Sequence, residues 1–292
     1  MIGQLAINGL IAGSIYALVA LGFTLIYGTV RFFHFAHGAV YAVGAYLAWL
    51  AVSRLGLPVL PSFFFACLLA GALGVLIDGA VYRPLRARKA PDLVFLLASF
   101  GIFAFLNNAL QLAFGADIKG LRAGPVKEGH HVLGAVITDI QILILVASVV
   151  LAMALVLFVK ATRLGKAIRA VADDPVAASI VGIHSERIIQ TSFFLGSVLA
   201  GAAGVLVSLE TNIEPTMGLN AILKGIIAAV IGGIGSIPGA LVGGLFIGLA
   251  ENLGIWGISA GWKDAIAFAI LVGFLLLRPA GIFGRESGIR RT

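Results

Sequence analysis

The stretch KATRLGKAIRAVADDPVAASIVGIHSER, residues 160–187, is the longest polar insert between the apolar runs of this chain. Its first part predicts a helix over residues 163–172 with two different faces. The apolar face carries residues at helical spacing, namely Leu164, Ile168 and Val171. The other face carries basic residues at three-residue steps, namely Arg163, Lys166 and Arg169.

The middle of the insert predicts a second, shorter helix. Asp173 and Asp174 precede Pro175, and the residue before a proline is disfavoured in the helical region, so the first helix is expected to end there. Asp174 suits an N-cap, Pro175 suits the first helical position, and Gly182 suits the C-terminal end. Such a pair of capped helices is typical of an element that docks onto a partner protein. A surface helix that lies on anionic lipid is the alternative.

The composition places the rest of the chain in a membrane. Of 292 residues, 60% are hydrophobic and 11% are charged, whereas soluble domains carry roughly 25% charged residues. We therefore expect an all-α polytopic membrane protein. The net charge of +7 does not indicate nucleic-acid binding, because the basic residues gather in short loops between apolar runs. The single cysteine, Cys67, excludes an intramolecular disulfide.

Apolar runs of about 20 residues, the length that crosses the hydrocarbon core, predict about seven to eight transmembrane helices plus a broken hairpin. The continuous runs lie at residues 5–27, 33–51, 59–81, 93–114, 137–159 and 188–209, and a shorter one lies at 265–277. We expect them to form a single transmembrane domain over residues 1–292, with residues 160–187 as its cytoplasmic coupling loop.

The remaining apolar run, residues 222–253, is interrupted in its middle by glycines and Pro238. Its halves, 222–235 and 238–251, have 14 residues each. A helix of that length covers about 21 Å, short of the roughly 30 Å core. This predicts a re-entrant hairpin with its tip at residues 235–238, next to a cavity at mid-depth in the membrane. A glycine-proline kink that only improves packing is the alternative.

The lysine and arginine counts predict the orientation. Basic residues concentrate in the loop 82–92, in the insert and in a tail that holds Arg278, Arg285, Arg290 and Arg291. With these and Arg31 on the cytoplasmic side, fourteen basic residues lie inside and six outside, and the N-terminus lies outside. A single long crossing at residues 222–253 would instead leave the four tail arginines outside.

Polar groups inside apolar runs are costly and usually face the bundle interior. Together with the tip, they are the candidates for a translocation pathway: Asn8, Tyr16, Thr24, His34, His37, Asn107, Gly235, Ser236, Pro238 and Glu251. Each could equally be a helix-to-helix hydrogen-bond partner. Neither His34 nor His37 has a cysteine or carboxylate at ligand spacing, so no metal site is expected.

Catalytic patterns are missing from the sequence. It has no phosphate-binding loop, no Ser-His-Asp or Cys-His arrangement and no paired carboxylates in one membrane segment. We therefore expect neither an enzyme nor a cofactor in this chain. If the chain moves a solute uphill, the energy is expected to come from another subunit, which the helices of the insert would engage.

Three stretches together carry a resemblance to a known family. They are NGLIAGSIYALVALGFTLIYGTVRFFHFAHGAVYAVGAY (8–46), RLGKAIRAVADDPVAASIVGI (163–183) and LKGIIAAVIGGIGSIPGALVGGLFIGLAENL (223–253). They resemble the permease subunits of bacterial ABC importers for branched-chain amino acids, most closely the shorter, LivH-type subunit. The resemblance extends in the same order over nearly the whole chain.

The resemblance implies a multi-pass subunit of the bacterial inner (plasma) membrane that moves leucine, isoleucine and valine. It implies a second, similar permease as partner, two ATPase subunits that bind ATP on the cytoplasmic side, and a periplasmic binding protein. It also implies that the insert engages an ATPase, with these candidate residues: Arg163, Leu164, Lys166, Ile168, Arg169, Asp173, Asp174 and Pro175. A related permease for urea, short amides or other amino acids is one alternative, and a stand-alone channel or facilitator is another.

Overall fold

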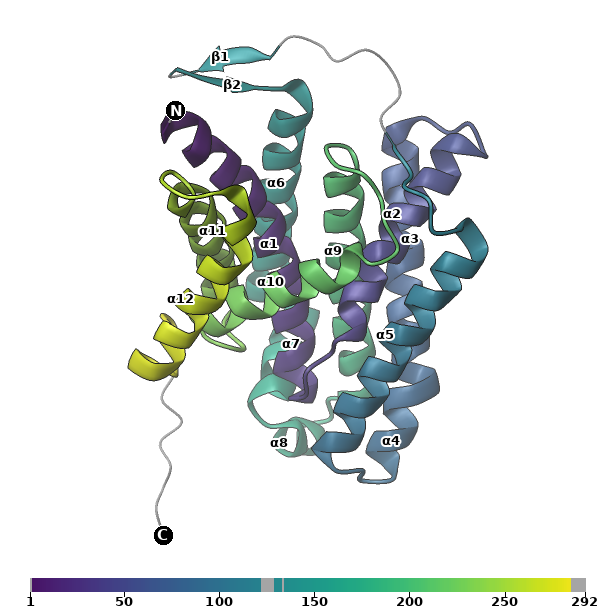
Figure 1. Ribbon diagram of the computed structural model, residues 1–292. Coiled ribbons are helices and arrows are strands. Elements are labelled where there is room, and N and C mark those ends of the chain that lie inside the picture. The colour runs from purple at the N-terminus through teal and green to yellow at the C-terminus, as the bar shows by residue number, and fades with distance from the viewer. Residues whose placement is uncertain (1, 122–128, 133, 285–292) are drawn as a thin grey trace.

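The computed structural model of the chain describes residues 2–121, 129–132 and 134–284, and nearly all of its regular structure is helical (Figure 1). Among these residues, eight helices are long and apolar enough to cross a membrane. They are α1 (Ile2–Val30), α2 (Ala36–Ser53), α3 (Val59–Ile77) with its continuations η1 (Asp78–Tyr82) and α4 (Arg83–Ala87), α5 (Asp92–Phe114), α6 (Asp139–Ala161), α9 (Ser185–Ser208), α11 (Ile237–Gly254), and α12 (Lys263–Leu277) preceded by η2 (Ala260–Trp262).

The remaining elements are short. The insert forms α7 (Arg163–Asp173) and α8 (Pro175–Ile180), and α10 (Met217–Gly232) precedes α11. An antiparallel hairpin of β1 (His130–Val132) and β2 (Ala135–Ile137) lies before α6. The predicted fold class, an all-α polytopic membrane protein with a broken helical hairpin, is confirmed. The predicted tail arginines Arg285, Arg290 and Arg291 lie outside the described residues.

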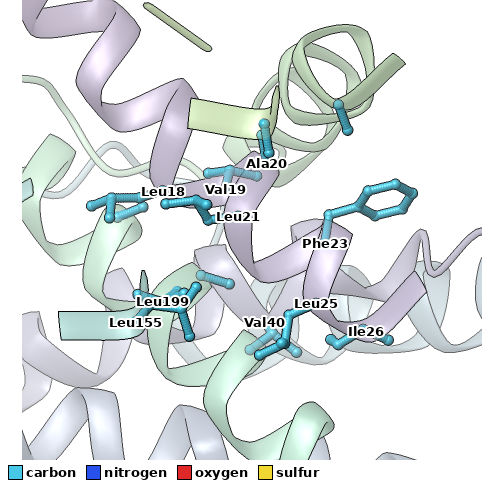
Figure 2. Close-up of a cluster of buried hydrophobic side chains, with 14 of the residues drawn as sticks. Leu18, Val19, Ala20, Leu21, Phe23, Leu25, Ile26, Val40, Leu155 and Leu199 are labelled. Atoms are coloured by element: carbon cyan, nitrogen blue, oxygen red, sulfur yellow. The ribbon is translucent and has the colours of Figure 1, made fainter. Parts of the chain in front are cut away.

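The helix α1 runs through the centre of the bundle. Its side chains from Leu18 to Ile26 are nearly all buried, and they meet Val40 of α2, Leu155 of α6 and Leu199 of α9 (Figure 2). This explains why residues 5–27 read as an uninterrupted apolar run, because a helix surrounded by other helices has no polar face.

Glycines let the central helices approach closely. A Cβ on Gly9 of α1 would lie 2.9 Å from the carbonyl oxygen of Gly248 in α11. A Cβ on Gly44 of α2 would lie 2.5 Å from Cα of Gly201 in α9. Since a larger side chain would push these helices apart, the glycines set the distances between α1 and α11 and between α2 and α9.

The two ends of the bundle differ (Figure 1). The helices α4, α7 and α8 lie at one end, here called the insert end, and the start of α1 and the β1–β2 hairpin lie at the other, the hairpin end. Phe283, which follows α12, lines the same cavity as Arg169 of α7. The chain after α12 therefore lies at the insert end, and the N-terminus lies opposite, as the basic-residue count predicts.

The predicted break in the run 222–253 is confirmed. The helix α10 ends at Gly232 and α11 begins at Ile237, and Gly233 (φ +104°) and Gly235 (φ +88°) adopt backbone angles that suit glycine. The last carbonyls of α10 accept hydrogen bonds from the chain after α12, where the N–H groups of Ile282 and Phe283 donate over 2.8 and 2.9 Å. The break is therefore held by backbone hydrogen bonds from another segment.

The lengths of the two halves differ from the prediction. The helix α11 does not end at Glu251 but continues to Gly254 with 18 residues, enough for about 27 Å, whereas α10 has 16. The tip residues Gly235 and Ser236 line a cavity together with Arg169 of the insert. The position of this tip at mid-depth in the membrane stays a prediction.

Candidate functional site

The helices of the insert are capped as predicted. A carboxylate oxygen of Asp174 accepts the N–H groups of Val176 and Ala177 over 2.8 and 3.0 Å, and Pro175 is the first residue of α8. A further cap was not predicted, although a threonine before a helix is a common signal: Thr162 Oγ1 accepts the N–H of Gly165 over 2.9 Å at the start of α7. Local side chains thus define both helices.

The apolar face of α7 is partly as predicted. Ile168 and Val171 are buried at 3% and 1% exposure, whereas Leu164 of the same predicted face is 49% exposed. Gly165 takes that place, because it packs directly on the backbone of Phe158 and Val159 at the end of α6. The bulkier Leu164 is turned outward.

Two arginines connect α7 to its neighbouring helices. Arg169 donates from Nη1 to the carbonyl oxygen of Val159 in α6, so this residue of the basic face is bonded within the chain. Arg31, which follows α1, donates from Nη2 to the carbonyl oxygen of Ala172 over 2.6 Å. A cation at the last carbonyls of a helix also complements the helix dipole. These two hydrogen bonds connect α7 to α6 and to the end of α1.

The helix α8 and the residue after it expose apolar side chains. Val176, Ile180 and Val181, here called the α8 patch, are 68%, 80% and 75% exposed. Arg163 and Lys166 of α7 are exposed as well. An exposed apolar patch with basic residues nearby marks a surface for a partner or for lipid.

A charge cluster ties the start of α9 to the end of α3. Arg86 of α4 donates to the buried carboxylate of Asp78 over 2.7 Å and to Glu186 of α9 over 2.7 Å. Because α9 begins directly after the insert, the cluster anchors the second end of the insert, as Arg31 anchors α7.

A cavity of about 650 Å³ lies at the insert end. It is lined by the tip residues Gly235, Ser236 and Pro238 and by Arg169 and Asp173 of the insert. The candidates for the pathway at the tip and the candidates for coupling in α7 therefore share one cavity. Sequence reasoning assigned them separately because they are some 60 residues apart in the chain.

A second cavity, of about 620 Å³, lies at the hairpin end, and Asn8 and Tyr16 of the predicted pathway line it. Glu251 is buried beside it and accepts the hydroxyl of Tyr16 over 3.3 Å. The main partner of Glu251 is the ammonium of Lys224 in α10, which is 6% exposed. Lys224 also pairs with Asp264 of α12 over 2.9 Å.

Sequence reasoning missed Lys224 and counted it among the six outer basic residues. The sequence does carry a signal for this ion pair, because Lys224 is the one charged residue of the run 222–250. A lysine within an apolar run requires a buried partner, and the nearest carboxylate along the run is Glu251.

The other predicted pathway residues lie outside both cavities in the described part of the chain. His34 is buried and shares a hydrogen bond of 3.0 Å with the hydroxyl of Tyr82. His37 is buried against Gly22, and Thr24 and Asn107 are buried in α1 and α5. These four residues lie within helix packing, and their contact with a solute stays a prediction.

A polytopic bundle with a charged, capped insert at one end and a cavity at each end suits a membrane transport protein. The sequence matches the family described as the branched-chain amino acid transport system, permease component, over residues 5–275, and the chain belongs to this family. The resemblance found in the three sequence stretches is therefore confirmed. The family consists of transport permeases rather than enzymes.

Two relatives cover nearly the whole chain. It is 39% identical over 297 residues to the high-affinity branched-chain amino acid transport system permease protein BraD of Pseudomonas aeruginosa, covering 97% of this chain and 95% of that protein. It is 38% identical over 295 residues, with the same coverage, to the protein LivH of Escherichia coli K12, which carries the same description. The fold is similar to that of PsaBC from Streptococcus pneumoniae in complex with Fab, with a TM-score of 0.55 at 14% identity, covering 94% of this chain and 92% of that one.

Proposed function

We propose that the chain is the permease subunit of an ABC importer in the bacterial inner (plasma) membrane and forms the pathway for leucine, isoleucine and valine. The match to the permease family over residues 5–275 carries this proposal, and the names of the two relatives support it. Two ATPase subunits bind ATP and supply the energy, a second permease completes the pathway, and a periplasmic binding protein delivers the solute. The chain itself needs no cofactor.

In this proposal the α8 patch docks onto an ATPase. The patch exposes Val176, Ile180 and Val181 on the side of the bundle that the basic-residue count makes cytoplasmic. A short helix in a groove of a partner is a common docking mode. Movement then passes from α8 to α7 and, through Arg169 and Arg31, to α6 and α1.

The two cavities provide the openings of the pathway. The tip after α10 borders the insert-end cavity, and Lys224 of the same α10 lines the hairpin-end cavity. A shift of α10 and α11 against α1 therefore opens one cavity as it closes the other. ATP binding in the partner subunits sets the direction of this shift.

The experiment has two parts. Affinity purification of the tagged chain is expected to recover a nucleotide-binding protein. In proteoliposomes that hold the recovered assembly, labelled leucine is expected to accumulate only with ATP and the binding protein.

Flux of leucine through liposomes that hold this chain alone would instead favour a channel or facilitator. Uptake of urea or short amides in preference to leucine by the complete assembly would identify a related permease with another solute. Either result contradicts the proposal.

A further inference from the structure

The hairpin-end cavity places opposite charges on two different helices. Lys224 of α10 lines it, and so does Asp264 of α12, with 2.9 Å between Nζ and Oδ1. The two partners of Lys224 are unlike: Glu251 is 1% exposed, whereas the side chain of Asp264 is 70% exposed. Tyr16 further fixes Glu251 by donating its hydroxyl to the carboxylate.

Because of this difference in exposure, the pair of Lys224 with Glu251 is permanent and the pair of Lys224 with Asp264 is exchangeable. Removing Glu251 would leave a buried cation without a partner, which is strongly unfavourable. The exposed carboxylate of Asp264 gains little from its pair, because water solvates it well when it leaves. Since Glu251 stays in place, Lys224 remains a hydrogen-bonded ammonium that can accept another carboxylate where Asp264 was.

An apolar wall faces the same cavity. Ile11 and Ile15 lie one four-residue step apart on α1, and both line the cavity. Residues at this spacing lie on one face of a helix. The cavity of about 620 Å³ therefore combines a hydrocarbon surface with a separable pair of charges, and its size suits a small molecule.

We infer that the hairpin-end cavity binds an aliphatic amino acid as a zwitterion, which inserts between Lys224 and Asp264. The carboxylate of the solute takes the place of Asp264 on Lys224, and its ammonium pairs with the released Asp264. The aliphatic side chain rests on Ile11 and Ile15. The inference rests on the proposed function and names the residues that recognise the solute.

The arrangement requires both charges of the solute. A zwitterion replaces one ion pair by two, so neither Lys224 nor Asp264 is left unpaired. An anion such as 4-methylpentanoate would occupy Lys224 and leave two carboxylates side by side, and a cation such as leucinamide would leave Lys224 without its second partner. Unpaired or like charges in a partly desolvated site discriminate strongly against the wrong solute.

The test is equilibrium binding of labelled leucine to the full-length chain in lipid nanodiscs, with 4-methylpentanoate and leucinamide as competitors. The wild-type chain is expected to bind leucine and to prefer it over either competitor. For Asp264→Asn we expect leucine to bind about tenfold more weakly, the loss of one ion pair. The same variant is expected to bind 4-methylpentanoate more tightly, because the repelling carboxylate is gone.

In Asp264→Asn the affinity for leucine is expected to fall while the affinity for 4-methylpentanoate rises. If Asp264 had only a structural role, its loss would weaken the binding of both ligands. Lys224→Arg is expected to keep leucine binding, and Lys224→Met to abolish it. Asp117→Asn is the matched control, since Asp117 is an exposed carboxylate paired with Lys119 outside the cavity.

Equal weakening of leucine and 4-methylpentanoate in Asp264→Asn overturns the inference, and so does absence of leucine binding by the wild-type chain. Both results leave the proposed function standing if the assembled importer still accumulates leucine. Failure of that assembly to accumulate leucine contradicts the proposed function instead.

Discussion

The two ends of the bundle use charged side chains in different ways. At the insert end, Arg31 and Arg169 donate to backbone carbonyls and fix the position of a helix whose neighbour exposes apolar side chains. At the hairpin end, Lys224 pairs with two carboxylates inside a cavity. The comparison teaches that the arginines at α7 hold backbone in place beside an apolar docking patch, whereas Lys224 pairs with carboxylates, one of which is exposed and can be replaced.

The largest effect is expected from breaking the buried pair at the hairpin end. Glu251→Ala leaves Lys224 buried without its main partner, which costs about 3–5 kcal/mol. We expect a much lower yield of folded chain and a lower midpoint of thermal unfolding in detergent. The double variant Lys224→Met with Glu251→Leu is expected to recover most of the stability, because an apolar pair replaces the ion pair.

The double variant also sharpens the comparison. It is expected to fold without binding leucine, since the ammonium that holds the solute is gone. A single variant Glu251→Ala as stable as the wild type would show that the buried pair does not hold α10 and α11 together.

A smaller effect, on transport alone, is expected from the α8 patch. Ile180→Ser combined with Val181→Ser removes apolar contacts for a partner, and we expect leucine uptake by the assembly to fall about tenfold. The midpoint of thermal unfolding should stay the same, because both side chains are already exposed. Ile118→Ser, at an apolar residue of 60% exposure outside the insert, is the matched control. Normal uptake by the α8 variant would exclude the patch as the coupling surface.

The smallest effect is expected from the cap of α8. Asp174→Ala removes the acceptor for two N–H groups and should destabilise α8 locally by about 1 kcal/mol. Amide hydrogen exchange over residues 175–181 measures this as faster exchange. Asp173→Ala serves as control, because Asp174 and not Asp173 caps α8. Equal exchange in both variants would mean that packing, rather than the cap, holds the helix.

The sequence predicted those features that depend on neighbours along the chain. The break before Ile237, the two helices of the insert and the cap by Asp174 follow from local backbone preferences, so residue types at short spacing were sufficient. The exposure of Leu164 was not predictable in this way. It depends on how closely Gly165 approaches α6, which is a tertiary contact.

By itself, then, the sequence determined that this chain is a helical membrane protein, where most of its helices begin and end, and to which family of permeases it belongs. The tertiary structure alone decided which polar residues meet. Lys224 pairs with Glu251, which lies 27 residues away along the sequence, and Tyr16 donates to the same carboxylate from 235 residues away. It also decided that His34 and His37 lie within helix packing and the tip lies beside α7. The physical reason is that helix formation depends on residues a few positions apart, whereas the pairing of buried charges depends on how whole helices pack.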